Sequence, residues 1–107
     1  MGASRLVIRS RAYGDRVVQL GPESLSIGRG TDQDIAIPDR KISSAHAVLE
    51  YRDGRYFIRD LGSTNGTYVF DQRIGRTELE NRTEFEIGTT TLMLIRSGGP
   101  HDGPATT

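Results

Sequence analysis

The sequence predicts an all-β fold, an antiparallel β-sandwich made of short strands. Strand-like runs recur about every eight to twelve residues, and segments rich in glycine, proline, asparagine and aspartate separate them. No window carries the apolar stripe of an amphipathic helix. Short strands at regular spacing without helices are typical of sandwiches, and a small barrel is the alternative architecture.

Alternation of apolar and polar residues locates the expected strands, because every second side chain of a strand points to the same face. In chain order, the strand-like runs are 5–10, 16–20, 25–28, 34–37, 46–51, 55–61, 67–70, 83–88 and 90–96. Leu6 and Ile8 in the first run, and Leu92 and Leu94 in the last, show the alternation clearly. We expect these four side chains to point into the core.

The segments between the runs predict turns. Asp53-Gly54 is the strongest hairpin signal, since this dipeptide suits a two-residue turn with positive φ. We also expect 70–75, "FDQRIG", to be a turn. The acidic segment 77–86, "TELENRTEFE", is expected to be the solvated face of one hairpin, where charge discourages edge pairing. Its glutamates are Glu78, Glu80, Glu84 and Glu86.

The length of 107 residues corresponds to one domain. We assign residues 1–96 to that domain. The last segment, 97–107 ("SGGPHDGPATT"), has almost no apolar residues and is expected to be a flexible tail or linker, so His101 within it is given no role.

Composition excludes several classes of function. Fourteen basic and fourteen acidic residues cancel, so no overall field favours nucleic acid or an anionic membrane. Without cysteine, and with two histidines, the chain offers no typical metal cluster, and no motif indicates a cofactor. No run approaches a membrane span, and the first residues lack the apolar core of a secretory signal. We therefore expect a monomer in the cytoplasm that binds neither nucleic acid nor membrane, and holds no metal or cofactor.

One segment, "RKISSAHAVLEY" (40–51), contains residue types that could support catalysis. Ser43 and His46, with Asp39 or Asp60, supply the residue types of a serine hydrolase. The context is missing, because a nucleophile elbow needs Gly-x-Ser-x-Gly between a strand and a helix, whereas "GSTNG" (62–66) has threonine at its centre. The sequence predicts a protein that is not an enzyme.

Two quoted stretches carry a family resemblance. "IGRGTDQDIAIPDRKISSAHAVLE" (27–50) is followed by "YFIRDLGSTNGTYV" (56–69). Together they contain Gly28-Arg29, then Ser43 and His46 three apart, then the series from Asp60 to Thr67. This ordered set resembles the forkhead-associated (FHA) domain. The resemblance implies a sandwich of about 11 short strands with Greek-key-type connections, and a module that binds phosphothreonine-containing proteins.

The resemblance also implies residue roles. Arg29 and Ser43 would contact the phosphate, Thr64 would stand beside it, and Asn65 would bind the main chain of the phosphopeptide. Ser44 is added to the phosphate-binding set because its hydroxyl can donate to a phosphate oxygen, although many family members have arginine there.

Five other residues complete the expected site. Gly28, His46 and Gly66 are expected to be structural, with His46 tying the binding loops together. Arg40 and Lys41 lie near Ser43 in the sequence. Their positive charges would favour an acidic residue in the ligand beyond the phosphothreonine.

Phosphothreonine suits these side chains. It carries a charge of about −1.5 to −2 at pH 7 and three acceptor oxygens, and the planar guanidinium of Arg29 matches two of them. The expected partner is a protein phosphorylated on threonine, a Ser/Thr kinase or its substrate. The alternative is a phosphate-independent interaction or oligomerisation module whose phosphate site has decayed.

Overall fold

The computed structural model describes residues 4–96. This part of the chain contains eleven strands and no helix, and therefore no helix able to cross a membrane. The expected boundary at residue 96 and the expected tail 97–107 fall at or outside the end of the described residues, and remain predictions. The strands are β1 (Ser4–Arg9), β2 (Arg16–Leu20), β3 (Leu25–Gly28), β4 (Ile35–Ala36), β5 (Ala47–Arg52), β6 (Arg55–Asp60), β7 (Thr67–Val69), β8 (Gln72–Arg73), β9 (Arg76–Leu79), β10 (Glu84–Ile87) and β11 (Thr90–Ile95).

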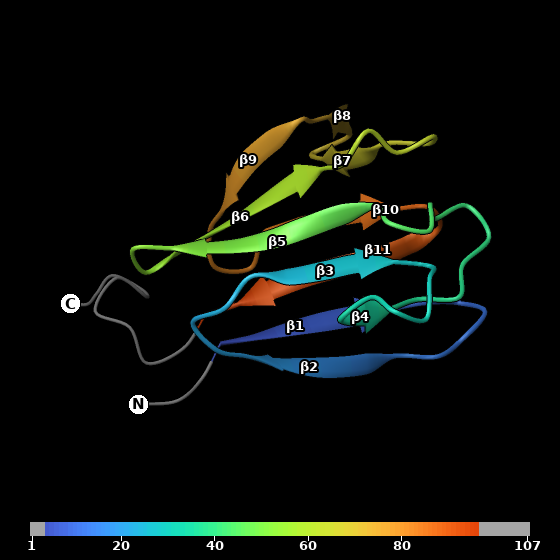
Figure 1. Ribbon diagram of the computed structural model, residues 1–107. Helices are drawn as coiled ribbons and strands as arrows, with labels where there is room; N and C mark the ends of the chain where they lie inside the picture. Colours follow the sequence, from blue (N-terminus) through green and yellow to red (C-terminus); the bar gives the residue numbers. More distant parts are fainter. Residues whose placement is uncertain (1–3, 97–107) are drawn as a thin grey trace.

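Two sheets lie face to face in two layers (Figure 1). A six-stranded sheet has the order β2-β1-β11-β10-β7-β8, and a five-stranded sheet has the order β4-β3-β5-β6-β9. The strand pairs are antiparallel except β3 and β4, which pair in parallel. The predicted sandwich is confirmed, and the barrel alternative is wrong.

The core lies between the sheets. Leu6 and Ile8 of β1, and Leu92 and Leu94 of β11, are all at most 1% exposed, which confirms the expected alternation. The two strands pair directly, with Leu6 opposite Leu94 and Ile8 opposite Leu92. The first and last strands of the described residues therefore lie side by side within the six-stranded sheet.

The Asp53-Gly54 hairpin is confirmed. It joins β5 to β6, and the two residues adopt φ of 51° and 81°. Both values lie in the left-handed region that this turn requires.

The acidic segment is arranged differently from the expectation. It contains β9, which pairs with β6 in one sheet, and β10, which pairs with β7 and β11 in the other. The prediction of one hairpin is therefore wrong, although its four glutamates are exposed as expected. Acidic and apolar residues alternate in both 78–80 and 84–87, so the pattern fits either pairing. Similarly, 70–75 contains β8 as well as a turn.

Candidate functional site

Three polar loops meet at one end of the sandwich, at the right of Figure 1. They are the β3–β4 loop (29–34), the β4–β5 loop (37–46) and the β6–β7 loop (61–66). Backbone hydrogen bonds join them, because Arg29 N donates to Ser43 O at 2.9 Å, and Leu61 N donates to His46 O at 2.9 Å. The residues singled out in the sequence are thus brought together by main-chain contacts.

Gly28 permits the closest of these approaches. A Cβ atom on Gly28 would lie 2.2 Å from the carbonyl oxygen of Ser44, well inside van der Waals contact. Two residues later, the backbone N–H of Gly30 donates to the same carbonyl oxygen of Ser44 at 3.1 Å. A side chain at Gly28 would push the β4–β5 loop away from Arg29.

His46 is fully buried between two of the loops. Its Nδ1 accepts a hydrogen bond from the backbone N–H of Ser43 at 3.0 Å, so Nε2 carries the proton and donates to Gly66 O at 3.0 Å. Gly66 has φ of 91°, which favours glycine. These contacts give His46 and Gly66 the structural positions that the sequence suggested.

The two hydrogen bonds of the His46 ring leave a serine hydrolase mechanism without a general base. Nδ1 of His46 is occupied by the Ser43 backbone N–H and its Nε2 by Gly66 O, so neither nitrogen is available to take the hydroxyl proton of Ser43. Asp60 lies 3.8 Å from Nε2, but on the side that faces Gly66.

Arg29 is exposed and directly follows β3. One edge of its guanidinium group is held in place by a hydrogen bond. Its Nε donates to the carbonyl oxygen of Ile42 at 2.9 Å. Within residues 4–96 no partner is recorded for its two terminal amino groups. The guanidinium is therefore oriented by the loop while its outer donors stay available.

The hydroxyl of Ser43 is fixed from the opposite loop. Thr64 N donates to Ser43 Oγ at 3.1 Å, so Oγ acts as an acceptor there and keeps its own proton to donate. Ser43 is half-buried, whereas the side chains of Ser44 and Thr64 are exposed. The structure thus brings Arg29, Ser43 and Thr64 to one surface, with Ser44 beside Ser43.

Asn65 connects the same two loops. Its Nδ2 donates to the carbonyl oxygen of Lys41 at 2.9 Å. The amide oxygen and a second N–H remain for a ligand, since one amide has four hydrogen-bonding positions. Arg40 and Lys41 are both exposed on the β4–β5 loop, next to this contact.

Asp60 organises the β6–β7 loop, a role that sequence reasoning missed. Its carboxylate accepts hydrogen bonds from Gly62 N (2.8 Å), Ser63 N (2.9 Å), Ser63 Oγ (2.6 Å) and Thr67 Oγ1 (2.8 Å). Burial raises the pKa of Asp60, but these hydrogen bonds outweigh it and the pKa lies below its ordinary value. An aspartate two residues before the Gly-Ser pair of a turn was the available signal. Arg73 adds a second support, because its Nη2 donates to Ser63 O at 3.2 Å.

Asp39 is the second missed residue, and it links the β4–β5 loop to the other sheet. It is 4% exposed and accepts hydrogen bonds from Lys41 N (2.9 Å), Thr89 N (2.8 Å), Thr89 Oγ1 (2.7 Å) and Thr90 Oγ1 (2.9 Å). Burial raises its pKa, yet the hydrogen bonds prevail and lower the pKa below its ordinary value. Asp39 and Asp60 hold loops in place and are not positioned as catalytic acids.

Comparison with known proteins identifies relatives of the chain. FhaB, an FHA domain-containing protein of Mycolicibacterium smegmatis, is 37% identical over 67 residues, 63% of this chain and 43% of FhaB. The glycogen accumulation regulator GarA of the same species is 31% identical over 94 residues, 88% of this chain and 60% of GarA. The chain spans about half the length of these curated relatives.

A solved structure supports the same relationship. A chain from a structural and functional analysis of phosphothreonine-dependent FHA domain interactions aligns with a TM-score of 0.77 and 25% identity, over 89% of this chain and 99% of that one. The family model of the FHA domain matches residues 25–88, which include all three loops of the site. The chain belongs to the FHA-domain family.

Proposed function

We propose that this protein is a non-enzymatic module that docks onto a partner phosphorylated on threonine. One observation carries the proposal: the backbone bond from Arg29 N to Ser43 O places an anchored guanidinium beside a hydroxyl that still has its proton. The arrangement matches a phosphate, which offers several acceptor oxygens and attracts a permanent positive charge. The solved relative with phosphothreonine-dependent interactions supports the same reading.

In the complex, Arg29 holds two phosphate oxygens through its free terminal amino groups, and Ser43 donates to another. Thr64 and Ser44, both exposed next to Ser43, contribute further hydroxyl donors. Asn65 binds the peptide main chain with the amide positions that Lys41 O leaves unused. Arg40 and Lys41 favour an acidic ligand residue beyond the phosphothreonine.

The strength of these contacts is sufficient for a phosphorylation switch. A hydrogen bond to a charged group contributes about 1.5 to 3 kcal/mol. Two such bonds therefore separate a phosphorylated ligand from its unmodified form by about a hundredfold or more.

The partner is a Ser/Thr kinase or one of its substrates, because threonine phosphorylation produces the ligand. That reaction consumes ATP, so we place the interaction in the cytoplasm. The domain acts as a monomer in this scheme, since the three loops that form the site come from one chain.

Calorimetric titration of one peptide in three forms tests the proposal. We expect the phosphothreonine form to bind at least about a hundredfold more tightly than the unmodified form, with the phosphoserine form between them. Equal binding of all three forms would contradict the proposal and favour a phosphate-independent module with a decayed phosphate site, the rival that Ser44 in place of arginine keeps open.

A further inference from the structure

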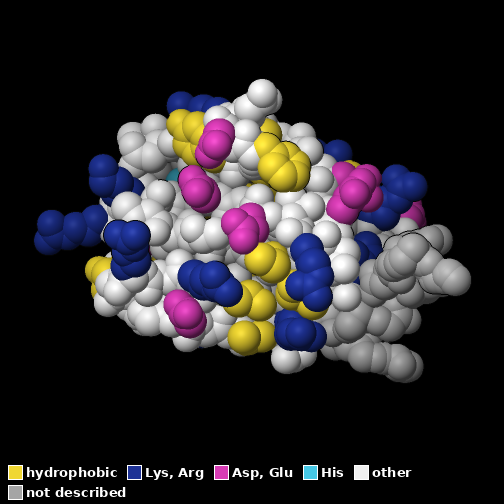
Figure 2. All heavy atoms as spheres, turned by 180° about the vertical axis from the view of Figure 1, so that it is seen from behind, with side chains coloured by type: hydrophobic (Ala, Val, Ile, Leu, Met, Phe, Trp, Pro, Cys, Tyr) yellow, Lys and Arg dark blue, Asp and Glu magenta, His cyan; other side chains and the backbone are white. Residues whose placement is uncertain are grey.

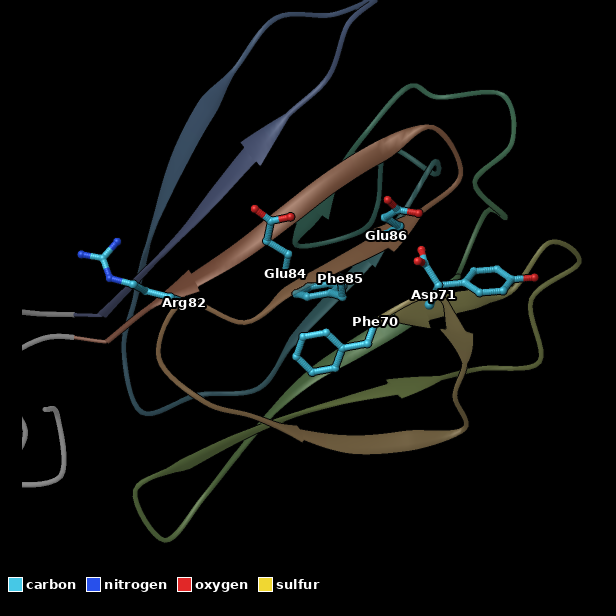
Figure 3. A pocket seen from close by; sticks show the side chains of 7 residues that line it. Phe70, Asp71, Arg82, Glu84, Phe85 and Glu86 are labelled. Carbon is cyan, nitrogen blue, oxygen red and sulfur yellow. The ribbon is translucent and has the colours of Figure 1, made fainter. Parts of the chain in front are cut away.

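The outer face of the six-stranded sheet has a hollow of about 250 Å³ beside the β7–β8 turn (Figure 3). It shares no residue with the candidate phosphate site. Its lining residues are Tyr68, Phe70, Asp71, Arg82, Glu84, Phe85 and Glu86.

Phe70 is the most conspicuous of the lining residues, because its side chain is 82% exposed. It forms the two-residue turn between β7 and β8 with Asp71, and their φ angles are 52° and 62°. Asparagine and glycine are favoured at such positions, whereas a bulky residue there is strained. The turn therefore displays an aromatic ring in water at a position where folding favours a smaller residue, which indicates a role outside folding.

Three carboxylates line the hollow together with this ring. Glu86 of β10 lies opposite Tyr68 of β7, and Glu84 lies one residue beyond the last pair of the two strands, Phe85 and Val69. Among residues 4–96, Asp71, Glu84 and Glu86 have no recorded hydrogen-bonded or ionic partner for their side chains. Arg82, the cation of the lining, extends away from the two glutamates in Figure 3. The hollow is therefore an aromatic site with unbalanced negative charge.

An apolar row continues from the hollow across the sheet. Glu84 lies opposite Met93, Met93 opposite Val7, and Val7 opposite Val17. Val17 is 53% exposed at the edge strand β2. Figure 2 shows this face, with hydrophobic side chains in patches and both acidic and basic side chains between and around them. The outer face of the six-stranded sheet thus has one position where aromatic and acidic residues meet, and an apolar strip beside it.

We propose that this surface, defined by Tyr68, Phe70, Asp71, Glu84 and Glu86, is a second docking site, which binds an arginine side chain from a protein segment with apolar neighbours. Charge complementarity selects the occupant. A guanidinium stacks on an aromatic ring and pairs with a carboxylate at the same time, whereas the flanking apolar residues cover Met93 and Val7. The inference does not depend on phosphothreonine binding.

The test uses the ¹⁵N-labelled protein and two probes, acetyl-Leu-Arg-Leu-amide and acetyl-Leu-Gln-Leu-amide. In NMR titrations we expect saturable shifts at the amides of 68–71 and 84–86 with the arginine peptide, and affinity about tenfold lower with the glutamine peptide. Phe70→Asn should abolish the saturable shifts while keeping the turn, because asparagine tolerates positive φ. The double variant Glu84→Gln/Glu86→Gln should weaken binding about tenfold.

Glu78→Gln is the matched control, since it removes an exposed strand carboxylate from the other sheet. It should leave the titration unchanged. The proposal is overturned if no saturable shift appears at millimolar peptide, if both peptides bind equally, or if Phe70→Asn binds like the native protein. It is also overturned if sedimentation shows a dimer that Phe70→Asn dissociates, because the occupant would then be a second copy of this chain.

Discussion

The Nδ1 atom of His46 lies 3.0 Å from the backbone nitrogen of Ser43, and this bond sets the shape of the β4–β5 loop. The other ring nitrogen reaches Gly66 O in the β6–β7 loop. One buried imidazole thus fixes the loop that carries Ser43 relative to the loop that carries Thr64 and Asn65.

We expect His46→Ala to lower the free energy of unfolding by roughly 2 to 4 kcal/mol, because it leaves the half-buried N–H of Ser43 and the buried C=O of Gly66 unpaired and opens a cavity. His46→Asn should be less damaging, since its amide oxygen can replace Nδ1 as the acceptor. Urea denaturation measures both. If His46→Ala is as stable as the native protein, the loops are held by the backbone bonds alone.

Arg29→Ala should reduce phosphopeptide affinity at least about tenfold without loss of stability, because it removes the one anchored positive charge from the site. Arg29→Lys should recover part of the affinity, since a lysine keeps the charge but cannot hold two oxygens in a planar fork. Arg52→Ala, at the exposed end of β5 beside the Asp53-Gly54 turn, controls for the loss of an arginine. Calorimetry that finds equal affinity for Arg29→Ala and the native domain would remove Arg29 from the proposed site.

Gly28→Ala should destabilise the fold by about 1 to 3 kcal/mol through overpacking. The new Cβ would lie 2.2 Å from Ser44 O, a backbone atom that cannot move aside as the end of a flexible side chain could. Gly21→Ala is the matched control, because nothing lies within 4 Å of a Cβ placed there. Thermal unfolding of both variants distinguishes the close contact from the general effect of adding a methyl group; equal melting temperatures would contradict it.

Stability should fall in acid. The folded protein holds the pKa of three carboxyl groups below their ordinary values: Asp39 and Asp60, where hydrogen bonds outweigh burial, and Glu50, through its bonds to Arg59 and Arg76. The unfolded chain then takes up protons first, so their stabilisation is complete above the ordinary carboxyl pKa and is lost as the pH falls through the lower folded values.

Urea denaturation at about pH 7, 5 and 3 measures this loss. Asp39→Asn should be less stable at neutral pH by about 1 to 3 kcal/mol and should lose less on acidification. Asp15→Asn, at an exposed position, is the control. A native curve that is flat down to the lowest pH would contradict the contribution of these carboxylates.

Sequence patterns predicted the sandwich and its core alternation, because each rests on local spacing. They did not predict the bond from Asp39 to Thr89, fifty residues away in sequence, because only the packing of two sheets brings these residues together. The sheet assignment of β9 and β10 failed for the same reason. Phe70 was missed as well, since an exposed aromatic in a positive-φ turn has no sequence signal that separates it from the end of a strand.

Ser44→Arg tests the departure from the family pattern. Ser44 is exposed, and its carbonyl oxygen already accepts the bond from Gly30 N, so a longer side chain can extend into solvent without changing that contact. A second guanidinium near the phosphate should tighten phosphopeptide binding by about threefold to tenfold at low salt, and the gain should shrink as salt screens the charge. Ser44→Gln, polar and neutral, is the control. If Ser44→Arg binds no better than Ser44→Gln in calorimetry, the phosphate lies beyond reach of position 44, and the Ser44 hydroxyl has no place in the phosphate site.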